Sequence, residues 1–119
     1  MRDIEPEDVL GRQAVKLDES AVSALISGQT VFVTGAGGSI GSELCRQIAR
    51  FSPAKLVLFE AAEFALYTIE QELRTLQPNL ACEFLIGDVR DVARLDEVMT
   101  RYRPAVIFHA AAYKHVPLM

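Results

Sequence analysis

From Thr30 onward, hydrophobic residues alternate between two spacings. Short, largely apolar runs occur at 30–34, 55–60, 82–88 and 105–110. Between these runs, apolar residues recur every three or four positions, which is the spacing of one face of an α-helix. The alternation predicts four buried strands separated by helices, and therefore a parallel sheet that is covered on both faces.

Each predicted helix carries an apolar stripe. The stripes comprise Ile40, Leu44 and Ile48; Leu66, Ile69, Leu73 and Leu76; and Val92, Leu95, Val98, Met99 and Tyr102. On the exposed sides, acidic residues stand four positions before arginines, in the pairs Glu70/Arg74 and Glu97/Arg101. Such pairs stabilise a helix by a few tenths of a kcal/mol.

The succession of strands and helices predicts a topology. Right-handed crossovers with a reversal after the third strand give the strand order 3-2-1-4, which is half of a doubly wound sheet. In that order the last strand lies in the middle of the complete sheet. We therefore expect the chain to be a fragment, truncated after the fourth strand.

Residues 1–28 differ in composition from the rest of the chain. They begin with a mixture of acidic residues, Pro6 and Gly11, which indicates an extended arm. Asp18 is then placed to cap a short helix that Gly28 would end. We expect an arm at 1–28, either docked or loose, followed by an incomplete α/β domain at 29–119.

Composition and charge exclude several function classes. The net charge of −4 offers no surplus of Lys and Arg for nucleic-acid binding. No signal peptide and no apolar run of membrane-spanning length is found, which predicts a soluble, cytoplasmic chain without membrane contact. Cys45 and Cys82 have neither metal-ligand nor CxxC spacing, so we expect free thiols and no metal site.

The stretch VFVTGAGGSIGSELCRQIAR contains four glycines between a strand and a helix. A P-loop would require Lys after its last glycine, and GxGxxG fails because Ile40 occupies the third glycine position. GxxGxxG does fit, with Gly35, Gly38 and Gly41. Gly35 would make the tight turn, Gly38 would allow close approach to a pyrophosphate, and Gly41 would let the helix pack on the strand.

Two acidic residues follow neighbouring strands. Glu60 ends the second strand, where a carboxylate can accept both ribose hydroxyls and would repel a 2′-phosphate, which favours NAD over NADP. Asp88 is placed to reach an adenine amino group, with Val89 against the ring. The alternatives are a solvated acid at Glu60 and a helix cap at Asp88, although Asp91 is equally placed for the cap.

The fourth strand runs into HAAAYKH. Small residues at the carboxyl end of a central strand let a cofactor approach the backbone, although tight packing explains alanines equally well. His109 is expected to be a strand-end histidine rather than a metal ligand. Lys114 and His115 are either exposed loop residues or groups that face a substrate phosphate.

Together these motifs resemble the extended short-chain dehydrogenase/reductases that modify nucleotide sugars. GGSIGSELCRQI and HAAAYKHVPLM are more specific, and resemble the CapD-like polysaccharide-biosynthesis dehydratases. The resemblance implies a Rossmann-type sheet and a nicotinamide cofactor. By the same resemblance, the cofactor cradle comprises Gly35, Gly38, Ser39, Ile40, Gly41, Glu60, Asp88, Val89, Ala111, Ala112 and Lys114.

The resemblance also implies an activity. In such nucleotide-sugar 4,6-dehydratases a hydride leaves C4 of the sugar, water is lost across C5–C6, and the hydride returns to C6. The C4 hydroxyl needs a base, commonly the Tyr of a YxxxK pair. Tyr67, Tyr102 and Tyr113 are followed four residues later by Gln71, Val106 and Pro117. We therefore assign no catalytic residue and expect the chain alone to be inactive.

Several questions stay open at the level of sequence. The parent protein resembles a UDP-N-acetylglucosamine 4,6-dehydratase of capsule or O-antigen assembly, and the alternatives are an epimerase or reductase of the same superfamily, or a non-catalytic nucleotide-binding module. The arm, with DVLGR and VKLD, resembles a connector from a membrane-anchored region. An exposed sheet edge would favour homo-oligomers. NADP remains possible beside NAD.

Overall fold

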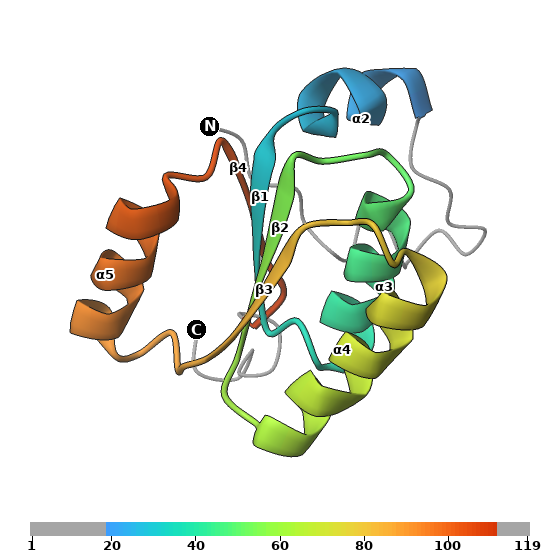
Figure 1. Ribbon diagram of the computed structural model, residues 1–119. Helices are drawn as coiled ribbons and strands as arrows, with labels where there is room; N and C mark the ends of the chain where they lie inside the picture. The colour runs from blue at the N-terminus through green and yellow to red at the C-terminus, as the bar shows by residue number, and fades with distance from the viewer. Residues whose placement is uncertain (1–18, 112–119) are drawn as a thin grey trace.

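The computed structural model describes residues 19–111, and the expectations that fall on 1–18 and 112–119 lie outside the described residues. In chain order the elements are α2 (Glu19–Ile26), β1 (Thr30–Thr34), α3 (Ser39–Ala49), β2 (Lys55–Glu60), α4 (Glu63–Leu76), β3 (Cys82–Ile86), α5 (Val92–Tyr102) and β4 (Val106–His109) (Figure 1). Each of the four predicted strands is present, and the third and fourth are shorter than their apolar runs.

The four strands form one parallel sheet in the order β3-β2-β1-β4, which confirms the predicted topology. Thr34 of β1 lies beside Phe59 of β2 and His109 of β4, and Glu60 lies beside Ile86 of β3. This register brings the carboxyl ends of all four strands to the same edge of the sheet. Loops that leave those ends therefore meet above one short stretch of backbone.

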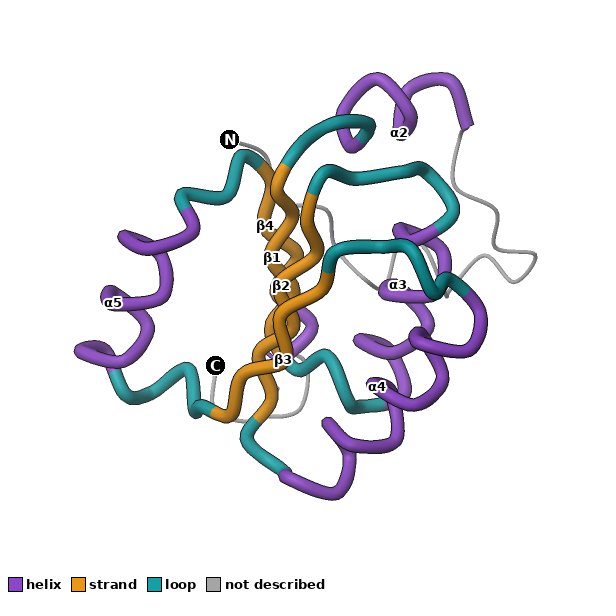
Figure 2. The backbone as a smooth tube through the Cα atoms, in the orientation of Figure 1, coloured by secondary structure: helices purple, strands orange, loops and turns teal. Residues whose placement is uncertain are grey.

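Helices cover both faces of the sheet. α3 and α4 lie on one face, and α5 is the one helix of residues 19–111 on the other, as the tube view shows (Figure 2). The alternation of side chains along β1 explains the two layers, because Val31 and Val33 join the cluster with α3 and α4. Phe32 faces the other way and packs with Val98 of α5. The helix α2 contributes to the larger of the two clusters.

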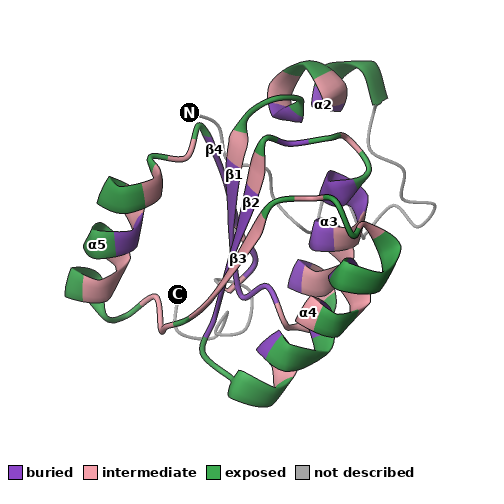
Figure 3. Ribbon diagram, in the orientation of Figure 1, coloured by how far each residue is buried: buried purple, intermediate pink, exposed green. Residues whose placement is uncertain are grey.

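Burial is concentrated in β1, β2 and β4 and on the inner faces of the helices, whereas β3 is mostly half-buried (Figure 3). Two members of the predicted apolar stripes are exceptions. Leu76 is 57% exposed and Val92 is 65% exposed, although both belong to the apolar stripes of the predicted helices. Leu76 is the last residue of α4 and Val92 is the first of α5, so each apolar stripe is longer than the part of its helix that is buried.

The predicted helix end at Gly28 and one of the two predicted ion pairs are present in the structure. Gly28 follows α2 with a φ of +71°, as expected of a residue that ends a helix. Glu70 and Arg74 form the predicted pair at 2.8 Å. The ion pair that the structure gives Glu97 is with Arg94, at 3.5 Å, and not with the predicted Arg101. Residues three apart on a helix are neighbours too, so both arginines are within reach of that carboxylate.

Both cysteines are free thiols, as expected. Cys45 is buried between α3 and the sheet, and Cys82 at the start of β3 is half-buried. Burial raises the pKa of Cys45, and it raises the pKa of Cys82 to about 11. The thiol form therefore predominates at neutral pH. No helix within residues 19–111 is long and apolar enough to cross a bilayer.

The layered packing predicts different effects for two leucines of α4. Leu73 is 1% exposed, so Leu73→Ala removes buried methyl groups and is expected to lower the free energy of unfolding by about 2–5 kcal/mol. Leu76→Ala is the matched control and should stay within about 0.5 kcal/mol of the wild type. Urea unfolding followed by circular dichroism measures both values. Equal losses in the two variants would contradict this packing.

Candidate functional site

The glycine loop joins the end of β1 to the start of α3. Gly35 has a φ of +65°, which is the left-handed conformation that residues with a Cβ rarely adopt. The amide N of Gly38 donates to the carbonyl O of Gly35 at 3.1 Å and closes the turn. Gly38 is also the N-cap of α3, and no side chain caps this helix end. The loop is therefore a tight turn that opens directly into a helix.

Two of the predicted glycines leave no room for a side chain. A Cβ on Gly35 would lie 2.6 Å from the amide N of Ala111, just after β4. A Cβ on Gly41 would overlap the carbonyl O of Gly35. Both obstacles are backbone atoms, which cannot move aside as a flexible side chain can. Glycine at these positions therefore lets α3, the loop and the end of β4 come together.

Gly37 has a structural role that the GxxGxxG spacing did not reveal. A Cβ on Gly37 would lie 2.7 Å from the Cβ of Ala65, so the loop packs directly on α4. The amide N of Gly37 also donates to Oε1 of Glu60 at 2.8 Å. The run of adjacent glycines was a possible clue, because Gly37 is the one glycine of the loop that the spacing left without a purpose.

Glu60 is buried, with only 3% of its surface exposed. Its second carboxylate oxygen, Oε2, accepts a hydrogen bond from the amide N of Ala62 at 2.9 Å. Both oxygens therefore hold backbone groups, one in the glycine loop and one at the start of α4. An ionised carboxylate has about four lone-pair positions, so two remain for other donors. Glu60 is not the solvated acid that the sequence left as an alternative.

The first turn of α3 presents backbone N–H groups that no intrahelical carbonyl can accept. Ser39 is exposed at this end, and Gly38 beside it is half-buried. Ile40 turns its side chain to the core cluster, so any part that it takes in a cradle is through its backbone. The positive end of the helix dipole lies at the same point. The residues present therefore fit a phosphate group.

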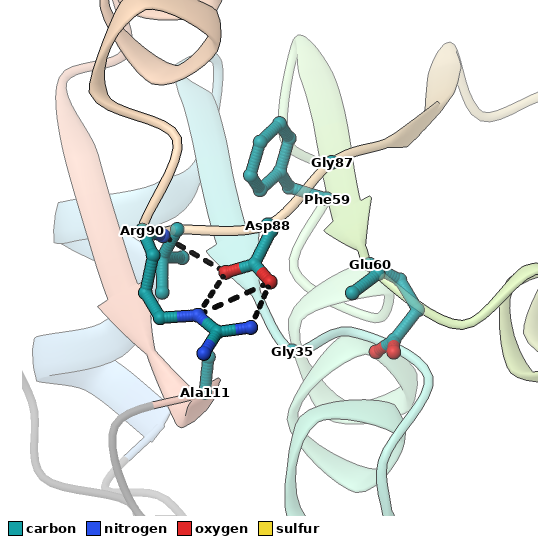
Figure 4. A pocket seen from close by; sticks show the side chains of 9 residues that line it. Gly35, Phe59, Glu60, Gly87, Asp88, Arg90 and Ala111 are labelled. Atoms are coloured by element: carbon teal, nitrogen blue, oxygen red, sulfur yellow. Dashed lines mark hydrogen bonds and ion pairs between the residues drawn. The ribbon is translucent and has the colours of Figure 1, made fainter.

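A shallow pocket of about 90 Å³ lies where the strand ends meet. It is lined from four segments by Gly35, Glu60, Asp88, Val89, Arg90 and Ala111, together with the small residues and Phe59 around them. Figure 4 shows the carboxylate of Glu60 turned toward the glycine loop, away from Asp88 and Arg90. The pocket is smaller than the roughly 300–1,000 Å³ of a complete ligand site, and is the size of a subsite.

Asp88 and Arg90 form a charged pair on the loop between β3 and α5. Nη2 of Arg90 donates to Oδ2 of Asp88 at 2.7 Å, and Nε donates to Oδ1 at 3.1 Å. The amide N of Arg90 also donates to Oδ1 at 2.9 Å, and these hydrogen bonds raise the pKa of Arg90. Asp91, rather than Asp88, caps α5, because its side chain accepts from the amide N of Arg94. Sequence reasoning did not select Arg90, although it lies within the GDVRD stretch.

The end of β4 is tied to β1 beside the pocket. The amide N of Ala111 donates to Oγ1 of the fully buried Thr34 at 3.4 Å. His109 is a half-buried strand-end residue. Ala112 and Lys114 lie outside the described residues. The structure thus brings the described members of the predicted cradle, from Gly35 to Ala111, to one edge of the sheet.

A sequence model of the polysaccharide biosynthesis protein family matches residues 31–119. The chain belongs to the polysaccharide biosynthesis protein family. It is 46% identical over its whole length to the capsular polysaccharide biosynthesis protein CapD of Staphylococcus aureus. It is 47% identical to the probable polysaccharide biosynthesis protein EpsC of Bacillus subtilis. The chain spans 20% of the length of each of these two proteins.

Two nucleotide-sugar enzymes are similar to this chain at lower sequence identity. The UDP-glucose 4-epimerase of Rhizobium leguminosarum bv. trifolii is 35% identical over 73% of this chain, which covers 24% of that enzyme. The dTDP-glucose 4,6-dehydratase of Neisseria gonorrhoeae is 32% identical over 74% of this chain, which covers 25% of that enzyme.

Solved structures agree with the fold of this polysaccharide biosynthesis family member. A-type ketoreductases from a modular polyketide synthase superpose with a TM-score of 0.58 at 25% identity, over 71% of this chain and 19% of theirs. Pen from Bacillus thuringiensis superposes with a TM-score of 0.55 at 23% identity, over 62% of this chain and 22% of its own. The likeness is to the α/β sheet and its covering helices.

The close packing at the loop predicts that Gly41→Ala destabilises the protein. Because the added methyl group meets the carbonyl O of Gly35, the helix must shift, and we expect a loss of about 1–3 kcal/mol in the free energy of unfolding. Ser39→Ala, at an exposed position in the same helical turn, should change it by less than about 0.5 kcal/mol. Urea unfolding measures both, and a neutral Gly41→Ala would contradict the packing described above.

Proposed function

We propose that the site binds NAD, and that it is the cofactor-binding part of a nucleotide-sugar dehydratase. The glycine loop supports this proposal most strongly. The backbone of Ala111 fills the space of a Cβ on Gly35, and the carbonyl O of Gly35 fills that of a Cβ on Gly41. The loop leads into a helix end that no side chain of the described residues caps. Such an end favours an anionic group. A base-sized pocket lined by Asp88 and Val89 opens beside it.

The proposed division of labour follows the geometry. The loop from Gly35 to Gly41 would hold the pyrophosphate, and Glu60 would face the ribose with its remaining lone pairs. Asp88 and Val89 would contact the adenine, and Ala111, Ala112 and Lys114 would lie toward the ribose and the nicotinamide. When bound, the nicotinamide supplies a hydride acceptor that can also return the hydride. The chain's own residues bind and orient this cofactor.

NAD is proposed over NADP because of Glu60. The carboxylate is buried, and its two hydrogen bonds come from neutral backbone amides rather than from a cation. Its negative charge is therefore not compensated at the place where a 2′-phosphate would add another. Like charges at such short range, away from bulk water, repel strongly.

The activity of the whole protein is proposed from its relatives. One relative is a dTDP-glucose 4,6-dehydratase, and members of the family are named for polysaccharide or capsule biosynthesis. We propose a UDP-N-acetylglucosamine 4,6-dehydratase as the parent activity. A UDP-glucose 4-epimerase is equally similar to this chain, so epimerisation of a nucleotide sugar is the second candidate. The same proposal places the parent protein in the cytoplasm, with a membrane anchor upstream of this chain, and makes it a homo-oligomer. It also divides the chain into an arm at 1–28 and a cofactor-binding domain at 29–119.

Replacing Glu60 tests the cofactor site. Glu60→Gln turns one acceptor into a donor, which then faces the amide N of either Gly37 or Ala62. An unsatisfied buried donor lowers the free energy of unfolding by about 1–3 kcal/mol. Hydrogen bonds to a charged group are worth about 1.5–3 kcal/mol, so the loss of the charged acceptor proposed for the ribose is expected to lower NAD affinity about tenfold. The preference for NAD over NADP should also narrow, because the negative charge is lost.

The control for Glu60→Gln is Glu63→Gln, an exposed acid in the first turn of α4 that should leave both affinities unchanged. Isothermal titration calorimetry with NAD and NADP measures the constants. A Glu60→Gln protein that binds both cofactors like the wild type would contradict the assigned role. A folded wild-type chain that binds neither would overturn the cofactor site itself.

The chain alone is expected to give no turnover. None of its three tyrosines has Lys four residues later, so the base expected for the C4 hydroxyl is missing. The test is to incubate the chain with UDP-N-acetylglucosamine and NAD and to look for a 4-keto sugar by mass spectrometry. Product above the level in buffer would show that the chain carries a catalytic base that sequence reasoning missed.

A further inference from the structure

Arg90 combines two properties that do not usually occur together. Its side chain is 81% exposed, yet it is held in one orientation by Asp88. Nε lies 3.1 and 3.3 Å from the two carboxylate oxygens, and Nη2 lies 2.7 Å from Oδ2. Exposed arginines gain little from a single ion pair, but a bidentate contact with a close neighbour in sequence fixes the plane of the guanidinium.

The contact with Asp88 uses one edge of the guanidinium. Nε and Nη2 form that edge, and the flat faces are not part of these hydrogen bonds. Figure 4 shows the guanidinium extended across the pocket, from Asp88 toward Gly35 and Ala111. A planar cation with an exposed face is thus held beside the pocket, next to the carboxylate expected to recognise an amino group.

We propose that the face of the Arg90 guanidinium is the platform on which the adenine ring of the nucleotide stacks. This inference rests on the proposed function, since it requires an adenine nucleotide in the pocket. Guanidinium groups stack on aromatic faces, and the interaction keeps the edge hydrogen bonds intact. Adenine would then lie over Arg90, with its amino group near Asp88.

A phosphate contact is the alternative use of an exposed arginine. Two observations favour stacking over it. The Nε/Nη2 edge, which offers a fork for a phosphate, is occupied by Asp88. The ion pair also compensates most of the positive charge, so the attraction for a second anion is reduced. The first turn of α3 is the better phosphate site, because its backbone N–H groups have no intrahelical acceptors and, among the described residues, no side chain caps them.

Two variants of Arg90 separate these uses. Arg90→Lys keeps the charge and can still pair with Asp88, but it has no planar face; Arg90→Ala removes both. If adenine stacks on Arg90, each variant weakens 5′-AMP binding by about three- to tenfold. Arg101→Lys is the matched control, because it is an exposed arginine near the other end of α5 and should change nothing.

A second pair of ligands separates stacking from an indirect role. 5′-IMP has a purine ring but lacks the 6-amino group that Asp88 would recognise. A stacking platform serves both rings, so Arg90→Ala is expected to weaken 5′-AMP and 5′-IMP by the same factor. If Arg90 only positioned Asp88, the variant would weaken 5′-AMP and leave 5′-IMP unchanged, and the proposal would be wrong.

Calorimetric titration of the wild type and the Arg90 variants with NAD, 5′-AMP, 5′-IMP and 2′,5′-ADP measures the affinities that distinguish stacking from a phosphate contact. Retained affinity in Arg90→Lys, with a larger loss for 2′,5′-ADP than for 5′-AMP in Arg90→Ala, would identify a phosphate contact and overturn stacking. Unchanged 5′-AMP binding in both variants would overturn any role for Arg90 while leaving the cofactor site intact. A folded wild type that binds neither NAD nor 5′-AMP would overturn the proposed function, and this inference with it.

Discussion

The backbone of Gly35 is packed on two sides so closely that no side chain fits, and the rest of the site depends on this packing. On one side a Cβ would lie 2.6 Å from the amide N of Ala111, and on the other the carbonyl O of Gly35 takes the space of a Cβ on Gly41. The ends of β1 and β4 and the first turn of α3 therefore meet at one residue. Without that close approach, the start of α3 and the pocket lined by Gly35 and Ala111 would not lie side by side.

Glu60 connects this packed point to the next strand. Its carboxylate is buried and accepts from the amides of Gly37 and Ala62, so one side chain joins the glycine loop to the start of α4. The contact between Gly37 and Ala65 follows from the same tie, because it brings the loop against the helix. The acid proposed to face the ribose thus also shapes the loop that would hold the phosphates. The same carboxylate group would therefore serve both the structure of the loop and the binding of the ribose.

Much of the fold could be predicted, because apolar runs and helical spacing are local properties. The strand order followed from handedness, whereas the cap of α5 was left open between Asp88 and Asp91 and is Asp91 in the structure. What failed or was missed depends on distance in space. The exposure of Leu76 and Val92 depends on where the sheet ends, and the partner of Glu97 depends on side-chain geometry.

The same limit applies to the site. The sequence indicated Glu60 and Asp88 as acids at strand ends, but it could not show that backbone amides hold the first and Arg90 holds the second. Hydrogen bonds between a side chain and a loop more than twenty residues away leave no periodic pattern. Arg90 was missed for a different reason: its contacts with Asp88 are local, and an exposed arginine two residues from an acid leaves no periodic pattern either.

The charges around the pocket explain how recognition can be divided between backbone and side chains. The carboxylate of Glu60 is hydrogen-bonded by two neutral backbone amides, whereas the charge of Asp88 is paired with the cation of Arg90. The helix end of α3 is the feature that favours an anion, and its donors are backbone groups. In the proposed complex, phosphate binding would depend on glycines that keep the backbone accessible. Selection among sugars and bases would depend on the carboxylates and the guanidinium, which hydrogen bonds within the chain hold in defined positions.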